Sequence, residues 1–255
     1  MNRILLIVSF LLLLAACSDK EAFVVEGTLQ NGADKTIYLD EMVPQGDRLF
    51  IDSIRLDDKG HFKFKYTAPY ESLYNLHVSE FDYVVLIPRK GEHIVVDGDF
   101  NQFEKTYTVK GSPESILLWQ LQDYSNAGAD QLLRIIAMHD QIKATKHGAD
   151  SLKAKESLDS LYLNAYKQQQ EYVVNFIQEH QGSLATLIAL YKPFNSHPLL
   201  DPKVNFDYYE YVLEGLQEAL PENPHTLNFK NTVEYLRHQY GDSQPTLDFE
   251  LTTNP

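Results

Sequence analysis

The spacing of apolar residues changes at Gly111, and this change sets the fold class of the chain. In residues 23–110, apolar and polar side chains alternate in short runs such as Phe62–Tyr66, which is the two-residue period of a strand. Beyond Gly111, apolar residues recur every three or four positions, which is the period of an amphipathic helix. Strands followed by helices predict an α+β protein, because the two kinds of element are separated along the chain.

Eight short segments of the first part are expected to be strands. Turn signals such as Asn31-Gly32 and Lys90-Gly91 lie between them. Short strands with regular turns predict an antiparallel β-sandwich or a partly open barrel, and the sequence leaves both open. The expected strands are residues 24–29, 36–40, 49–56, 62–66, 73–78, 83–88, 93–97 and 106–109.

Residues 111–240 are expected to form a helical bundle of about five helices. Ser112 precedes Pro113, and a capping hydroxyl followed by proline at the first helical position typically begins a helix. The other expected helices are residues 150–180, residues 185–191, and two that begin at Asp201-Pro202 and Asn223-Pro224.

The first sixteen residues have the pattern of an export signal. Arg3 is positive, and residues 4–16 are apolar except for Ser9. This run is too short for a membrane-spanning helix, which needs about 20 apolar residues. The sequence Leu14–Cys17 resembles the lipobox of bacterial lipoproteins, in which the bond between Ala16 and Cys17 would be cut. The alternative is an ordinary secretory signal with an unrelated cysteine.

The lipobox resemblance implies a lipid anchor at Cys17. The thiol would receive a diacylglycerol and the new amine a fatty acid such as palmitate, because stable anchoring takes more than one chain. Residues 17–22 would then be the lipidated cysteine and a short tether to the bilayer. Residues 18–21 also resemble the acidic signal that sends Bacteroidota lipoproteins to the surface of the outer membrane, although a generic acidic spacer has the same composition. We therefore expect a lipid-anchored protein of the cell envelope.

Charge and composition exclude several classes of function. The formal net charge of −14 argues against binding to nucleic acid, whose phosphates require a basic surface. It argues equally against electrostatic adhesion to anionic lipids. Cys17 is the only cysteine, so no disulfide is expected, and the hydrophobic content of 44% must provide the core. No cofactor is expected.

The order of parts resembles a Bacteroidota lipoprotein family that carries the domain of unknown function 4369. Members begin with a lipobox, continue with a β domain that opens on a segment like residues 23–29, and reach a junction like Gly111-Ser112-Pro113-Glu114. Helical segments like residues 180–185 and 220–225 follow. The resemblance implies a signal peptide over 1–16, a β domain over 23–110 and a helical domain over 111–240.

Many members of that family add a thioredoxin-like domain with a Cys-x-x-Cys pair. The tail, residues 241–255, contains a segment at 245–253 that resembles the strand with which such a domain opens. The redox pair cannot be assigned to this chain, because no second cysteine is present. The resemblance therefore implies a scaffold without the chemistry that usually accompanies it.

No catalytic residue or metal site emerges from the motifs. Residues 97–101 begin like a calcium loop, but Gln102 and Thr108 stand where that loop needs Gly and Glu, so a hairpin turn is expected. Ser112 follows a glycine but lies in no Gly-x-Ser-x-Gly elbow, and helix capping accounts for it. None of the nine histidines has a metal-binding partner at helical or strand spacing.

Two further groups of residues are candidate sites. Tyr208, Tyr209 and Tyr211 lie beside acidic residues and could hold a sugar or a peptide, although aromatic residues at helical spacing are more often core. The following serines lie in Asp-Ser-aliphatic tripeptides resembling the sites that Bacteroidota O-glycosylate, and chance matches are common: Ser53, Ser151 and Ser160.

The sequence thus predicts a non-catalytic binding or scaffold module of the envelope. Its expected partners are the bilayer, through acylated Cys17, and an envelope protein such as a separate thioredoxin-like protein. One alternative is the accessory part of a truncated or split thiol-disulfide oxidoreductase, which the tail motivates. A second alternative is a glycan-binding module built on the tyrosine-rich helix.

Overall fold

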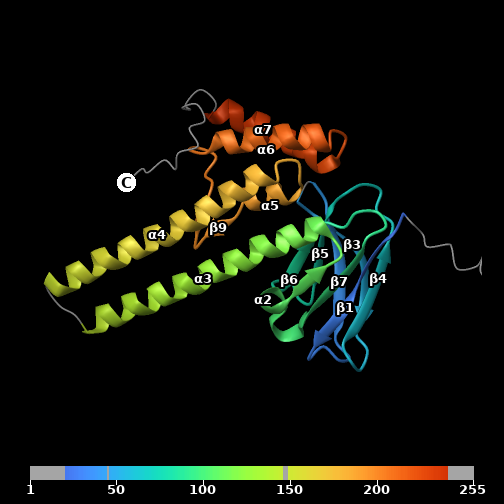
Figure 1. Ribbon diagram of the computed structural model, residues 1–255, viewed down its shortest axis with the longest axis horizontal. Coiled ribbons are helices and arrows are strands. Elements are labelled where there is room, and N and C mark those ends of the chain that lie inside the picture. Colours follow the sequence, from blue (N-terminus) through green and yellow to red (C-terminus); the bar gives the residue numbers. More distant parts are fainter. Residues whose placement is uncertain (1–20, 45, 146–148, 241–255) are drawn as a thin grey trace, which may run out of the picture.

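The computed structural model describes residues 21–44, 46–145 and 149–240. The strands gather at one end of the molecule, and two long helices, α3 (Pro113–Thr145) and α4 (Ala149–Glu179), run side by side well past them (Figure 1). The shorter helices form a layer near the end of the pair that lies by the strands, where α3 begins and α4 ends: α5 (Ala185–Leu190), α6 (Phe206–Ala219) and α7 (Pro224–Tyr240). The chain is therefore an α+β protein, as its sequence predicts.

Two four-stranded sheets form the β domain. The first has the order β4 (His61–Tyr66), β1 (Phe23–Gln30), β7 (His93–Asp99) and β8 (Thr108–Lys110). The second has the order β3 (Arg48–Arg55), β2 (Thr36–Met42), β5 (Leu73–His77) and β6 (Tyr83–Leu86). All eight expected strands are present.

The two sheets share one core, and neither closes into a barrel. Phe23 of the first sheet meets Tyr74 of the second edge to face, with ring centroids 5.1 Å apart. Both side chains are fully buried in a cluster that contains residues of both sheets. Of the two architectures expected, the sandwich is the one formed, because the inner faces bury each other.

One strand pair departs from the antiparallel pattern. Strands β1 and β7 are parallel, whereas every other pair within the two sheets is antiparallel. Gly27 allows this close pairing, because a Cβ there would lie 1.7 Å from the carbonyl oxygen of Val96. A parallel pair needs a long connection, and the whole second sheet lies between β1 and β7 in the sequence.

The hairpin turn expected at residues 97–101 is wrong. Strand β7 continues to Asp99, and a 3₁₀ turn, η2 (Phe100–Gln102), and a one-turn helix, α2 (Phe103–Thr106), follow before β8. The Asp99 carboxylate accepts a hydrogen bond from the amide of Asn101, and Asp82 accepts from the amides of Phe103 and Glu104. These carboxylates satisfy helix starts, and the inserted turn buries Phe103 completely.

The five expected helices are confirmed, with one correction at a start. Ser112 caps α3 by accepting the amide of Ser115, and Asn223 caps α7 by accepting the amide of His225. Asp201-Pro202 begins no helix: the backbone carbonyl of Asp201 closes a turn by accepting the amides of Val204 and Asn205, and α6 starts at Phe206. The sequence also missed a small strand pair, β9 (Pro193–Phe194) with β10 (His197–Pro198). None of the described helices is long and apolar enough to span a membrane.

Buried polar groups fix the helices on the sandwich. At the start of α3, Ser112 Oγ donates to the carbonyl oxygen of Ile87, and the amide of Ile87 donates to Ser115 Oγ. Glu114, one residue into the same helix, accepts from Arg89 at 3.0 Å and from the hydroxyl of Ser183. The first turn of α3 is thus tied to the strand end at Ile87 and to the chain before α5.

A second buried contact joins α7 to the sandwich. The Ser72 hydroxyl and His225 Nε2 are 2.9 Å apart, although 153 residues separate them in sequence. Asn223 donates to the carbonyl oxygen of Glu71 beside them. Burial lowers the pKa of His225 to about 4, so this histidine is neutral at physiological pH.

His225 makes the stability of the protein depend on pH. An unfolded chain protonates a histidine near pH 6.5, whereas folded His225 does so only near pH 4. Between these values the unfolded state binds more protons, so the free energy of unfolding falls as the pH falls. We expect this residue to remove on the order of 2 kcal/mol between about pH 7.5 and about pH 5. Urea unfolding of the wild type and of His225→Gln measures it, and equal pH dependence in the two proteins would contradict the assignment.

Candidate functional site

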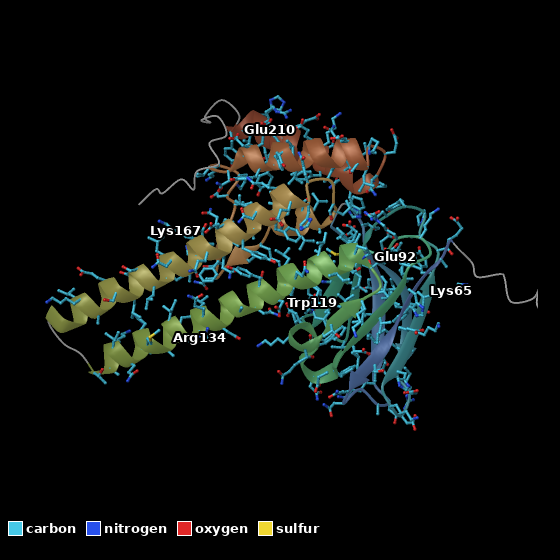
Figure 2. All side chains as sticks on the ribbon, viewed as in Figure 1. Lys65, Glu92, Trp119, Arg134, Lys167 and Glu210 are labelled. Atoms are coloured by element: carbon cyan, nitrogen blue, oxygen red, sulfur yellow. The ribbon has the colours of Figure 1, made fainter. Side chains whose placement is uncertain are left out.

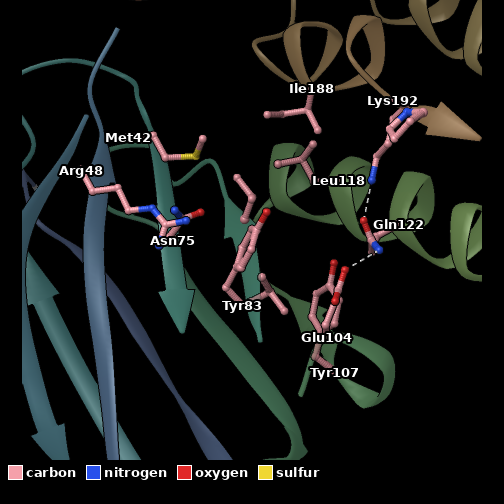
Figure 3. Close-up of a pocket in the computed structure, with 13 residues that line it drawn as sticks. Met42, Arg48, Asn75, Tyr83, Glu104, Tyr107, Leu118, Gln122, Ile188 and Lys192 are labelled. Atoms are coloured by element: carbon pink, nitrogen blue, oxygen red, sulfur yellow. Dashed lines mark hydrogen bonds between the residues drawn. The ribbon is translucent and has the colours of Figure 1, made fainter. Parts of the chain in front are cut away.

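A cavity of about 390 Å³ lies between the second sheet and the helices (Figure 3). Strands β2, β3, β5 and β6 form its floor, and α2, α3, α5 and β9 form its walls. This volume lies within the usual range for small-molecule sites, about 300–1,000 Å³. The lining residues are Met42, Arg48, Asn75, Tyr83, Val84, Val85, Glu104, Tyr107, Leu118, Gln122, Ile188, Lys192 and Pro193.

Strand register places the polar groups of the floor. Side chains alternate along a strand, so Asn75 lies on the opposite face from buried Tyr74 and Leu76, which belong to the sandwich core. Arg48 crosses this outer face and lies over the ring of Tyr83, 5.5 Å from its centroid. Asn75 is 1% exposed, and its Oδ1 has no hydrogen-bond partner among the described residues.

A chain of three polar residues forms the opposite wall. Lys192 Nζ donates to Gln122 Oε1 at 2.5 Å, and Gln122 Nε2 donates to Glu104 Oε1 at 3.0 Å. Figure 3 shows the three side chains in line, from the end of α5 through α3 to α2. Burial lowers the pKa of Lys192 and raises the pKa of Glu104, and each charge partly opposes the shift of the other. The amide of Gln122 therefore holds an ammonium and a carboxylate apart at the edge of one cavity.

Next to the cavity, the outer face of the sheet carries a histidine–carboxylate pair. His77 Nε2 and Asp40 Oδ2 are 2.9 Å apart, and the ring of His77 stacks on Tyr38. His77 Nδ1 is buried and has no hydrogen-bond partner in the described part of the chain. No hydroxyl or thiol among these residues completes a nucleophile–base arrangement with His77, so the pair extends the polar floor without forming a triad.

The region between the β domain and the helices also has an apolar component. Trp119 points from α3 toward the strands (Figure 2), and its Nε1 donates to the carbonyl oxygen of Tyr107. Leu118 and Ile188 line the cavity itself. The geometry can hold a small molecule that has both polar and apolar parts. Over residues 21–44, 46–145 and 149–240, no group of three His, Cys, Asp or Glu side chains could hold a metal ion.

The site residues predicted from motifs lie elsewhere. Ala16 and Cys17, the expected cleavage and lipidation positions, fall outside the described residues, as does the side chain of Ser151. Ser53 is exposed on β3, and Ser160 is exposed on α4, where its hydroxyl donates to the carbonyl oxygen of Glu156. Glycosylation of these serines stays a prediction.

The tyrosine-rich helix provides core contacts. Tyr209 is buried, and its hydroxyl donates to the carbonyl oxygen of Leu200. Tyr208 and Tyr211 are partly buried and pack against the helical core. The alternative role in sugar or peptide binding would therefore have to use rings that already have packing partners.

Sequence reasoning missed the wall of the cavity. One signal was available for Gln122, because it lies four residues after Leu118 and next to Leu121, on the stripe of α3 that faces the core. A polar residue on such a stripe usually has a buried partner. No comparable signal existed for Glu104, which lies on the unpredicted helix α2, or for Lys192, which directly follows α5 in no helix or strand.

Residues 23–118 match the model of a family described as Domain of unknown function (DUF4369). This part of the chain is a DUF4369 domain. It includes the whole β-sandwich and ends at Leu118, inside α3. No curated protein matches the chain.

The boundary of the DUF4369 domain passes through the cavity. Its floor, Glu104 and Leu118 belong to the domain, whereas Gln122, Ile188 and Lys192 follow it in the sequence. The part of the chain after Leu118 therefore supplies the ammonium and the amide of the site. The cavity is a property of the two parts together.

The charge arrangement of the wall predicts how Lys192 titrates. The pKa of Lys192 should lie below the usual 10.5, and Glu104→Gln should lower it further, because the carboxylate favours the charged ammonium. Nuclear magnetic resonance of ¹³C-methylated lysines measures this directly. Glu156→Gln, which removes an exposed carboxylate on α4, is the matched control and should leave Lys192 unchanged. A pKa at or above 10.5 in the wild type would refute the arrangement.

Proposed function

We propose that this protein is a lipid-anchored cell-envelope lipoprotein that acts as a non-catalytic binding module, with the cavity as its binding site. The observation that carries the proposal is the unused hydrogen-bonding capacity inside a cavity of about 390 Å³. Asn75 Oδ1 has no partner among the described residues, and Lys192 Nζ donates one of its three N–H groups, to Gln122. Buried polar groups are normally satisfied, so open capacity in a cavity favours a ligand.

Binding is favoured over catalysis by what surrounds these groups. Catalysis needs a nucleophile or an acid–base group poised against a reacting atom. In the described part of the chain, Lys192 is held by a neutral amide and His77 by Asp40. The first contact orients the Lys192 ammonium and the second orients the His77 ring, and neither contact generates an activated nucleophile. The scaffold role proposed from the sequence is compatible with this, because two parts of the chain build one site.

The anchor is proposed from the lipobox at Leu14–Cys17. The residues that follow it support a short connection to the membrane. Glu21 pairs with Lys90 at 2.7 Å, and Ala22 is buried, so the folded part begins within five residues of Cys17. A chain rises at most about 3.6 Å per residue, so the sandwich would lie within roughly 20 Å of the lipid.

The proposed anchor predicts the behaviour of a cysteine variant. In cells fed an alkyne fatty acid, the wild type should incorporate the label and partition into detergent-rich phases. Cys17→Ala should lose both properties, because no thiol remains to receive the diacylglycerol. Ser18→Ala is the matched control and should behave like the wild type. Label retained on the Cys17→Ala protein would rule the anchor out.

The proposed binding site predicts the effect of filling the cavity. Full-length protein in detergent micelles is screened against a fluorinated fragment library by ¹⁹F nuclear magnetic resonance. Ile188→Trp should remove the hits that the wild type gives, because the indole occupies the cavity. Leu133→Trp, at a position 61% exposed on α3, is the control and should keep them. Hits that survive Ile188→Trp, in a variant with an unchanged melting temperature, would exclude this cavity as the site.

The partner we propose is a separate thioredoxin-like envelope protein. The alternative is that this chain is the accessory part of a split or truncated thiol-disulfide oxidoreductase. Its support is the segment at 245–253, which resembles the opening strand of a thioredoxin-like domain and lies outside the described residues. The genomic sequence after codon 255 distinguishes a separate partner from a split or truncated oxidoreductase. A downstream frame encoding Cys-x-x-Cys would favour the oxidoreductase.

A further inference from the structure

Two cations line the cavity without a carboxylate partner in the described residues. The contact of Lys192 Nζ is the amide oxygen of Gln122, and the contact of Arg48 is the face of the Tyr83 ring. Arg89, at the nearby domain junction, shows the contrast, because it pairs with both Glu71 and Glu114 at 3.0 Å. Lys192 is partly buried, whereas Arg48 is exposed at the rim of the cavity. A partly buried cation such as Lys192 normally has an anionic partner, since desolvation penalises its charge.

Glu104, the carboxylate on the same wall as Lys192, is not the ion-pair partner of either cation. Glu104 reaches Lys192 only through the amide of Gln122, and it forms no ion pair with Arg48 in the described part of the chain. Asp40, on the adjoining part of the floor, is bonded to His77. The cavity thus carries two cationic groups against one lining carboxylate, in a chain whose net charge is −14. A positive site within a negative protein favours an anionic ligand.

Several other lining residues are apolar. Met42, Val85, Leu118, Ile188 and Pro193 all face the cavity. Such a surface gains free energy when it contacts the hydrocarbon part of a ligand. A highly charged, fully polar ligand such as a phosphate would leave this surface unused, and its second charge would be repelled by Glu104.

We propose that the cavity binds a small organic monocarboxylate with an apolar body. This inference rests on the proposed binding function and names the ligand class. The carboxylate accepts a hydrogen bond from Lys192 Nζ, the positive charge of Arg48 adds to the attraction, and the hydrocarbon part lies against Leu118 and Ile188. Asn75 Oδ1 accepts a hydrogen bond from a donor group of the ligand where it has one. The same chemistry is available from a free acid and from the C-terminal carboxylate of a peptide.

Titration of matched probes tests the inference on full-length protein in detergent micelles. The probes are 3-phenylpropanoate, its uncharged amide 3-phenylpropanamide, and N-acetyl-glycyl-phenylalanine. We expect the two carboxylates to bind and the amide to bind about 10- to 100-fold more weakly, as for loss of a charge-assisted hydrogen bond. The tighter of the two carboxylates identifies the source as a free acid or a peptide end.

Variants assign the effect to the cavity. Lys192→Met keeps the length of the side chain and removes its charge, and it should weaken carboxylate binding about 10- to 100-fold without changing amide binding. Arg48→Met should act in the same direction. Lys153→Met, at an exposed position of α4, is the matched control and should have no effect. Melting temperatures equal to that of the wild type exclude a folding defect as the cause.

The outcomes separate this inference from the binding function on which it rests. If acid and amide bind equally, or if carboxylate binding survives Lys192→Met, the anionic ligand class is wrong while a cavity that binds fragments remains. If fragments bind in the ¹⁹F screen but neither carboxylate binds, the inference also fails alone. If no fragment binding is lost in Ile188→Trp, the binding function itself fails.

Discussion

The reciprocal hydrogen bonds between the start of α3 and Ile87 are the constraint on which the rest of the arrangement depends. Ser112 donates to the carbonyl oxygen of Ile87, and Ser115 accepts from its amide. All of these groups are buried, so their loss would leave unsatisfied donors and acceptors. Because the helix is fixed at its first turn, its Leu118 and Gln122 come to lie over the outer face of the second sheet.

The site that results belongs to neither part of the chain alone. The DUF4369 domain contributes a sheet face with Arg48, Asn75 and Tyr83, together with Glu104 from the turn of helix after β7. The chain after Leu118 contributes Gln122 and Lys192, and the hydrogen bond from Gln122 to Glu104 crosses the boundary of the domain. The row of Lys192, Gln122 and Glu104 therefore forms only where the helices cover the second sheet.

Much of the fold follows from local patterns, whereas the site does not. Alternating side chains and turn residues predicted all eight strands, and Ser112 and Asn223 marked two helix starts, because each signal acts within a few residues. The failures at residues 97–101 and at Asp201 have different causes. At residues 97–101, Asp82, which is distant in sequence, accepts the amide of Phe103 and supports the inserted helical turn. At Asp201, the carboxylate does accept the amide of Lys203, but the backbone closes a turn on the Asp201 carbonyl and α6 begins only at Phe206.

The sequence by itself determined the order of strands and helices and the lack of any second cysteine, because these depend on periodicity and composition. It also identified the β part as resembling a known domain family, which residues 23–118 confirm. Only the tertiary structure decided that the sheets form a sandwich, that β1 and β7 run parallel, and that Glu104, Gln122 and Lys192 meet. Those outcomes depend on contacts between residues far apart in the chain, whose pairing no local pattern encodes.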